Sequence, residues 1–144
     1  MSAEELPAVL AGMDIVVNPG LVLETFCISN IEAMSMGVPL VTFAVGGIGE
    51  YVAAPPQLSA DQDREGEGVD FSVSANAVVA HRASPEALAR AVLHLLHRPA
   101  LRRELGAAGR RTVLARFTVQ RQMQQYSDLY QHIVTASTAS SRHC

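Results

Sequence analysis

The sequence predicts an α/β fold, in which a partial parallel sheet is followed by a helical C-terminal segment. Short apolar runs alternate with helical segments over residues 3–53, in the order that βαβ units require. The run at 39–45 (PLVTFAV) is apolar at nearly every position, which is typical of a strand covered on both faces. From residue 84 onward, apolar residues recur at helical spacing, which predicts the helical segment.

The first elements follow from apolar runs and their terminators. Residues 3–12 are predicted to form a short helix that ends at a glycine, and 14–19 (DIVVNP) a buried strand closed by an Asn-Pro pair. Residues 28–36 suit a second helix, which Gly37 ends before the strand at 39–45. The connections between these elements are short, as βαβ units require.

The middle of the chain breaks this pattern. A glycine turn at 46–52 (GGIGEYV) is predicted to open a short helix. Residues 54–75 are rich in Pro, Asp, Glu and Gly without a period, which predicts an exposed loop or insertion. Alternating acids within it resemble a cation site, but no EF-hand pattern follows, so a solvated loop is preferred. Residues 76–81 (NAVVAH) form a third strand candidate.

Helices are predicted over the rest of the chain. Ser84, Pro85 and Glu86 form a helix start, with a capping residue, a proline at the first position and an acid in the first turn. Arg98-Pro99 is predicted to end this helix and begin the next. The apolar positions assigned to these two helices are Leu88, Val92, Leu95, Leu96, Leu101, Leu105, Leu114 and Phe117.

A last helix is predicted to start after Thr118. Its apolar residues recur at spacings of four and three over about two heptads, at Val119, Met123, Tyr126, Tyr130 and Ile133. This spacing fits a coiled-coil seam or packing against the domain's own core, and we prefer the core. Residues 134–144 are small and polar and are predicted to be a flexible tail after a single domain at 1–133.

Composition places the chain among globular proteins. It has 144 residues, 49% apolar and 17% charged, and a net charge of −3. The charge is uneven, since ten of the arginines lie in residues 82–144, which carry only three acids. An anionic partner or arginines on solvated helix faces would explain this, and we prefer the solvated faces. Nucleic-acid binding is not expected, because aromatics are few and no such motif is present.

Targeting signals and metal motifs are not evident either. The first residues, MSAEEL, are acidic where a signal peptide needs positive charge. The apolar stretch at 6–23 is interrupted by Asp14, Asn18 and Pro19, so no membrane span is expected. The two cysteines form no metal-type or redox-type pair, and a cytoplasmic location is expected.

A candidate site follows from the first predicted strand. Glu24 lies in the turn after that strand, and ligands of parallel sheets bind at the carboxyl ends of strands. The next residues, Thr25 to Ile28, run into a helix start, whose free amides can bind phosphate without a basic side chain.

Two further features belong to the same candidate site. Glu32 lies about one helical turn after Ile28, and its carboxylate suits sugar or ribose hydroxyls. A Gly46-Gly47 turn would let a second loop approach closely at the end of the next strand.

These residues resemble the C-terminal nucleotide-binding domain of GT-B glycosyltransferases, in particular the retaining enzymes of family 4. Glu24 and Glu32, with seven residues between them, are followed by Ala-Met, as in the family's hallmark. Gly37-Val38-Pro39 matches the family's Gly-x-Pro before a buried strand, and 46–50 matches its GG-x-x-E turn. The resemblance covers about residues 5–133 and implies a partial Rossmann-like parallel sheet with a helical C-terminal segment.

The resemblance also implies residue roles. Glu24 would contact the donor sugar's hydroxyls as a catalytic residue, and Glu32 would bind the ribose. The amides of Phe26, Cys27 and Ile28 would meet the diphosphate, with Gly46 and Gly47 lining the substrate site. Two features depart from the family's pattern. Thr25 and Cys27 stand where glycines are frequent in the family, which narrows the space for a diphosphate but leaves the backbone amides in place. The 54–75 loop is longer and more acidic than usual.

The expected function is therefore retaining transfer of a sugar from a UDP-, GDP- or ADP-linked donor, with no cofactor or metal. Neither the donor's base nor the acceptor is encoded in these residues. Two parts that the resemblance implies are not found in these residues: the family's N-terminal domain, and the first half of its C-terminal domain, whose basic residues neutralise the diphosphate. We therefore expect this chain alone to be inactive. The alternative is a truncated, non-catalytic module that binds nucleotides or other proteins.

Overall fold

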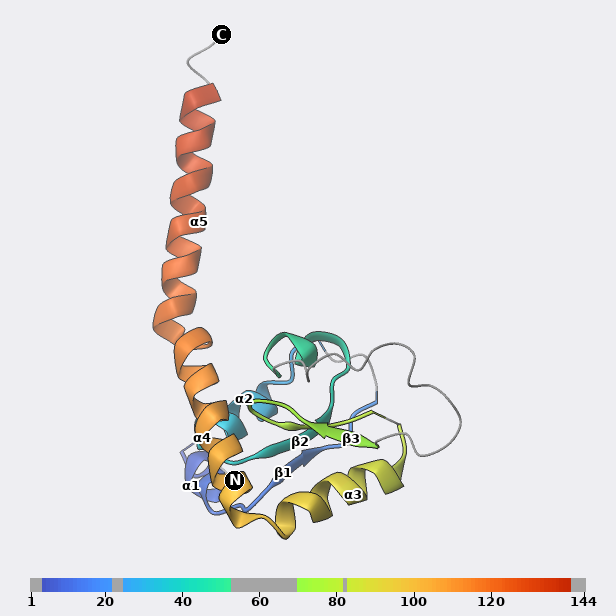
Figure 1. The fold of residues 1–144 in the computed structure, drawn as a ribbon. Helices are drawn as coiled ribbons and strands as arrows, with labels where there is room; N and C mark the ends of the chain where they lie inside the picture. Colours follow the sequence, from blue (N-terminus) through green and yellow to red (C-terminus); the bar gives the residue numbers. More distant parts are fainter. Residues whose placement is uncertain (1–3, 22–24, 53–69, 82, 141–144) are drawn as a thin grey trace.

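The computed structural model describes residues 4–21, 25–52, 70–81 and 83–140, and the side chains up to residue 136. Its sheet has four strands in the order β1-β2-β4-β3 (Figure 1). The strands are β1 (Val16–Asn18), β2 (Leu40–Phe43), β3 (Phe71–Val73) and β4 (Val78–Ala80). β1, β2 and β4 are parallel, and they confirm the three strands predicted from the sequence.

β3 corrects the sequence prediction, which assigned its residues to an exposed loop. It pairs antiparallel to β4, with Phe71 opposite Ala80 and Val73 opposite Val78. The connection between them is closed by Ser74, whose hydroxyl donates to the carbonyl of Ala77 at 2.9 Å. A three-residue strand beside a Pro- and Gly-rich stretch has no period of its own, so the hairpin partner decides its structure. Residues 53–69, most of the predicted loop, lie outside the described residues.

The helices lie close to their predicted positions. They are α1 (Leu6–Ala11), α2 (Ile28–Ser35), the 3₁₀ helix η1 (Gly46–Glu50), α3 (Pro85–Leu96), α4 (Pro99–Arg116) and α5 (Val119–Ser140). Ser84 caps α3 as predicted, because its hydroxyl accepts a hydrogen bond from the amide of Ala87 at 3.1 Å.

Both faces of the sheet are covered, as the continuous apolar character of β2 predicted. On one face, Leu40 packs with Met34 of α2 and Val113 of α4. On the other, Val41 packs with Leu95 of α3 and Leu105 of α4. Every residue of β2 is buried, and burying each large aliphatic side chain stabilises the fold by about 1.5–3 kcal/mol.

Glycines let α2 and α4 approach closely. Gly37 has a φ of +77° and ends α2, and its amide and the next one donate back into the last turn. An added Cβ at Gly106 of α4 would lie 2.0 Å from the carbonyl oxygen of Gly37. At Gly109, the added Cβ would lie 3.4 Å from the side chain of Met34. Gly106 therefore faces backbone, whereas Gly109 faces a flexible side chain.

Four arginines bind the carbonyl ends of helices. Arg98 and Arg102 donate to the last carbonyls of α3 at 2.6–3.1 Å. Arg110 donates to the last residue of α2, and Arg116 donates to the last residue of η1 at 2.8 Å. A cation at this end of a helix also meets the negative end of its dipole. Part of the positive charge in this half of the chain thus caps helix ends within the fold.

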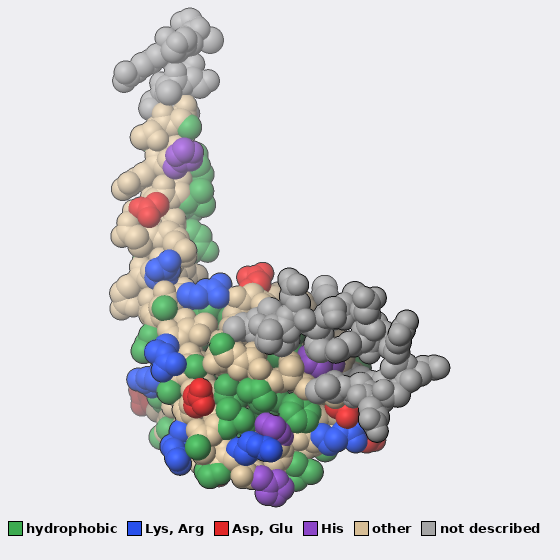
Figure 2. All heavy atoms as spheres, in the orientation of Figure 1, with side chains coloured by type: hydrophobic (Ala, Val, Ile, Leu, Met, Phe, Trp, Pro, Cys, Tyr) green, Lys and Arg blue, Asp and Glu red, His purple; other side chains and the backbone are tan. Residues whose placement is uncertain are grey.

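α5 corrects a second prediction, because it does not pack against the core. It projects away from the body of the domain (Figures 1 and 2). The seam residues are 50–69% exposed, at Val119, Met123, Tyr126, Tyr130 and Ile133. The helix also continues to Ser140, so most of the predicted flexible tail is helical, and residues 141–144 lie outside the described residues. Spacing alone shows that a helix has an apolar face, but not what covers it.

Across the described parts of the chain, no helix combines the length and apolar character needed to cross a bilayer.

Candidate functional site

The candidate site is the turn that leads from β1 into α2. Its described part, Thr25–Ile28, leads into the first residue of α2 at the carboxyl ends of β1 and β2. Glu24, the predicted catalytic residue, lies outside the described residues, so its position remains a prediction. The structure does place the predicted phosphate amides of Phe26, Cys27 and Ile28 at the start of a helix. The first amides of a helix have no partner within it and carry the positive end of its dipole.

Cys27 gives this turn its shape. Its φ of 60° and ψ of 79° lie in the left-handed region, and among the described non-glycine residues only Cys27 has a positive φ. Glycine adopts this conformation without cost, whereas other residues pay about 1–2 kcal/mol. This is one of the two positions, with Thr25, where the sequence departs from the family's frequent glycine. The cysteine therefore keeps the glycine-like backbone, and surrounding contacts must stabilise it.

Those contacts come from a polar network that the sequence reasoning missed. The side-chain amide of Asn18, at the end of β1, donates to the Sγ of Cys27 at 3.1 Å and to the Oδ1 of Asn30 at 3.2 Å. Asn30 is buried, and its own amide donates to the hydroxyl of Tyr51 at 2.9 Å. The sequence signal for this network was Asn30, a polar residue on the apolar side of the predicted helix, between Cys27 and Ile31.

The second glycine loop lies directly against this turn, as the sequence predicted. An added Cβ at Gly47 would lie 1.8 Å from the carbonyl oxygen of Thr25. Gly46 has a φ of 60°, which turns the chain from β2 into η1. The two glycines therefore bring η1 into backbone contact with the candidate phosphate turn. Their role in binding a substrate stays a prediction.

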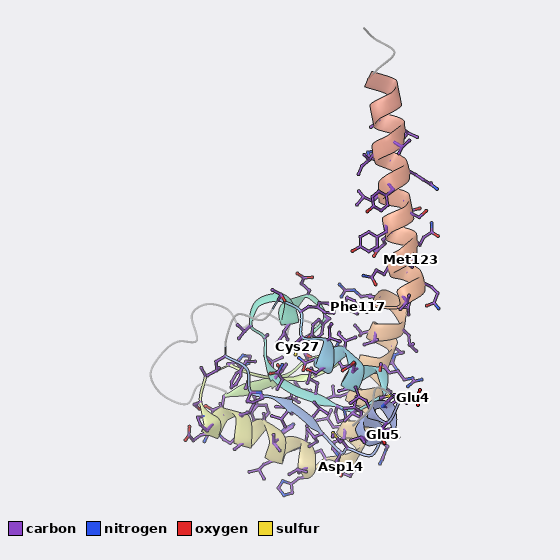
Figure 3. The ribbon with its side chains drawn as sticks, turned by 180° about the vertical axis from the view of Figure 1, so that it is seen from behind. Glu4, Glu5, Asp14, Cys27, Phe117 and Met123 are labelled. Carbon is purple, nitrogen blue, oxygen red and sulfur yellow. The ribbon has the colours of Figure 1, made fainter. Side chains whose placement is uncertain are left out.

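An aromatic cluster joins the turn to the base of α5. The ring of Phe26 meets those of Tyr51 and Phe117 edge-to-face, with centroids 5.5 and 5.3 Å apart. Beside it lies an open cavity of about 600 Å³, lined by Phe26 and Ile28 on one side and Arg116 and Gln122 on the other. Figure 3 labels Cys27 and Phe117, which mark the neighbouring ends of α2 and α4. The side chains of Phe26 and Ile28 thus face the α4–α5 junction.

Glu32 lies on α2, one turn after its start, and its side chain is partly buried. The helix places it on the segment that begins at the candidate turn, as predicted. Its relation to Glu24 stays a prediction, because Glu24 is not described. Among the described side chains, no group of three His, Cys, Asp or Glu residues could hold a metal ion.

The chain is similar to known proteins in sequence and in fold. Residues 1–112 match the family model "Glycosyl transferases group 1". The solved structure of sucrose-phosphate synthase from Thermosynechococcus elongatus is similar, with a TM-score of 0.70 and 29% sequence identity. The similarity covers 94% of this chain and 29% of that one, so the chain spans less than a third of this relative's length. The search of curated proteins found no match. With the family model covering most of its length, the chain belongs to the group 1 glycosyl transferases.

Proposed function

We propose that this chain forms part of the donor site of a retaining glycosyltransferase, which moves a sugar from a nucleotide sugar to an acceptor hydroxyl. The observation that carries the proposal is the turn at Thr25–Ile28. It opens a helix at the carboxyl end of the sheet, with Gly47 against its backbone, inside the stretch that matches the family. Helix starts at this edge of an α/β sheet are favourable sites for a diphosphate.

In the proposed mechanism, the start of α2 stabilises charge on the leaving group. Negative charge grows on the diphosphate as the bond to the sugar breaks, and the fixed amides of Phe26, Cys27 and Ile28 offset it. Glu32 accepts hydrogen bonds from the ribose, and Glu24 from the donor sugar, as the family resemblance implies. These residues hold the donor in position, and catalysis in such a site is largely positioning and electrostatics.

The acceptor site is assigned to an N-terminal domain outside these residues. The cations that neutralise the diphosphate are assigned to the first half of the C-terminal domain, which also lies outside them. The support is the solved relative, of which this chain matches only 29% of the length. We therefore expect the 144-residue chain to bind donors weakly and to transfer no sugar by itself. Turnover of a nucleotide sugar by the purified chain would contradict this expectation.

The test is a titration of the ¹⁵N-labelled chain with UDP-, GDP- and ADP-glucose, followed by NMR. One of them is expected to shift the amides at the start of α2. Glu32→Gln should weaken the binding of that donor by about 10- to 150-fold, since a hydrogen bond to a charged acceptor contributes roughly 1.5–3 kcal/mol. Glu104→Gln, at an exposed position of α4, is the matched control and should leave the affinity unchanged. Equal affinity in the Glu32 variant would remove Glu32 from the site, and no response to any donor would reject the proposal.

A second candidate function, a protein-interaction module, is favoured by one observation. α5 projects from the domain with exposed apolar residues, including Met123 and Tyr130, along its length. Deletion of residues 119–144 separates the two candidates. The donor response should survive the deletion if the chain binds nucleotides through the turn. A purely interacting module should show no donor response with or without α5.

A further inference from the structure

We infer that Asn18 is a positioning residue that sets the geometry of the turn at the start of α2, and through it the affinity for a nucleotide diphosphate. The ligand part of this inference rests on the proposed function. The structural part rests on hydrogen bonds of the described residues alone. The residue roles that the family resemblance implies do not include this asparagine.

Asn18 uses both ends of its side-chain amide. Its Oδ1 accepts a hydrogen bond from the amide of Gly20 at 2.9 Å, which fixes the chain as it leaves β1. Its Nδ2 donates to the Sγ of Cys27 and the Oδ1 of Asn30, at 3.1 and 3.2 Å, which fixes the chain as it enters α2. One side chain on a strand of the sheet thus holds both ends of the connecting segment.

The position of Asn18 is itself fixed from the core. Val17 and Asn18 pair with Val41 and Thr42 of the neighbouring strand. Asn30, the other partner, is 1% exposed and donates to Tyr51, which is also 1% exposed. The turn is therefore tied to rigid and buried groups. Such support is what a binding site needs, because small displacements of its hydrogen-bond donors weaken binding.

Cys27 is the residue on which this support acts. Its left-handed backbone, with a φ of 60°, is unfavourable for a residue with a side chain. The sulfur of Cys27 accepts a hydrogen bond from Asn18 and shares a second one with the hydroxyl of Ser29 at 3.2 Å. These two contacts fix the position of the Cys27 side chain. Without Asn18, the turn is expected to relax toward an ordinary backbone conformation. The amides that follow would then point in a different direction.

Asn18→Leu tests this inference, because it keeps the branching and the number of heavy atoms of the side chain and removes all three hydrogen bonds. Asn76→Leu is the matched control. Asn76 is 3% exposed, so it is more buried than the half-buried Asn18. It donates to the carbonyl of Tyr51 and the hydroxyl of Thr112, and neither of these hydrogen bonds reaches a residue of the turn. Both variants remove a hydrogen-bonded side-chain amide, so both lower stability. Only the Asn18 variant should change the turn.

The assay is alkylation of Cys27 by iodoacetamide, in a Cys144→Ser background that leaves Cys27 as the one remaining thiol. Rates are measured by mass spectrometry with and without the UDP-, GDP- and ADP-glucose panel, well below each variant's unfolding temperature. In the parent chain, the bound donor should slow alkylation. Asn18→Leu should raise the rate without donor several-fold and require about tenfold more donor for protection, as expected for misplaced binding groups. Asn76→Leu should match the parent in both respects.

The outcomes separate the inference from the proposed function. If the donor protects the parent and the Asn18 variant behaves like the parent, the inference is overturned and the function stands. If the Asn18 variant alone alkylates faster but no donor protects any chain, Asn18 positions the turn and the proposed function fails. Equal acceleration in both asparagine variants would show a loss of stability without a specific effect on the turn, and would overturn the inference.

Discussion

Gly47→Ala is expected to destabilise the fold and displace the candidate phosphate turn, whereas Gly49→Ala is expected to do neither. The two glycines lie in η1, two residues apart. Neither has a positive φ, so other residue types can adopt both backbone conformations. Their surroundings differ. A Cβ at Gly47 would lie 1.8 Å from the carbonyl oxygen of Thr25, while a Cβ at Gly49 meets nothing within 4 Å.

The size of the effect follows from this contact. Cβ atoms essentially never approach other heavy atoms closer than 3.0 Å, so η1 and the turn must separate by roughly 1.2 Å. The obstacle is backbone, which cannot rotate away as a side chain would. Overpacking of this kind costs about 1–3 kcal/mol. Gly49→Ala restricts only the unfolded chain and should be neutral or stabilise by up to about 1 kcal/mol.

Urea unfolding followed by circular dichroism measures the free energy of unfolding of both variants, and thermal unfolding measures their Tm. A donor titration measures the affinity of the turn for the donor. A loss of about 2 kcal/mol would lower the Tm by roughly 5–10 °C for a domain of this size. Donor affinity should fall by about tenfold or more in the Gly47 variant, because displacements near 1 Å are costly in a binding site. If Gly47→Ala is as stable as Gly49→Ala, the close packing of η1 on the turn is wrong.

Two further predictions concern the helices. Gly106→Ala should lower stability by about 1–3 kcal/mol despite the higher helix propensity of alanine, because its Cβ would lie 2.0 Å from the carbonyl of Gly37. Gly109→Ala should change stability by less than about 1 kcal/mol in the same urea assay, and equal losses would contradict the packing of α4 on α2. Burial, and then the nearby Arg98, lower the pKa of His94 below its ordinary 6.5. The contribution of neutral His94 to stability is thus present above pH 6.5 and lost as the pH falls below it. His94→Gln should flatten the pH dependence of stability, measured by thermal unfolding from pH 7.5 to 5.

Local sequence patterns predicted most of the fold. The strands β1 and β2 have apolar runs with proline or glycine at their ends, and β4 has a short apolar run of its own. The start of α3 has a complete capping signature. β3 was missed because its structure depends on pairing with β4, and a three-residue segment has too few positions to show alternation. α5 was predicted as a helix but wrongly packed, since the spacing of its apolar residues does not identify their partner.

The candidate site was predicted less completely, for a related reason. A turn before a helix and a glycine pair after a strand are local features, and their backbone contact follows from the fold of parallel strands. The network from Asn18 through Asn30 to Tyr51 joins residues 12 and 21 positions apart. Each asparagine alone is a common residue. Only the folded structure shows that the two amides meet beside Cys27.

The same contacts connect the turn to the helix that projects from the domain. Phe26, in the turn, packs against Phe117 at the end of α4, and Arg116 donates to the last carbonyl of η1. Tyr51 touches both aromatic rings and also accepts the hydrogen bond from Asn30. A displacement of α5 at its base must therefore shift either the aromatic cluster or the end of α4, the helix that precedes α5 in the chain. Because packed cores deform poorly, the orientation of α5 and the shape of the turn are mechanically linked through Phe26, Tyr51 and Phe117.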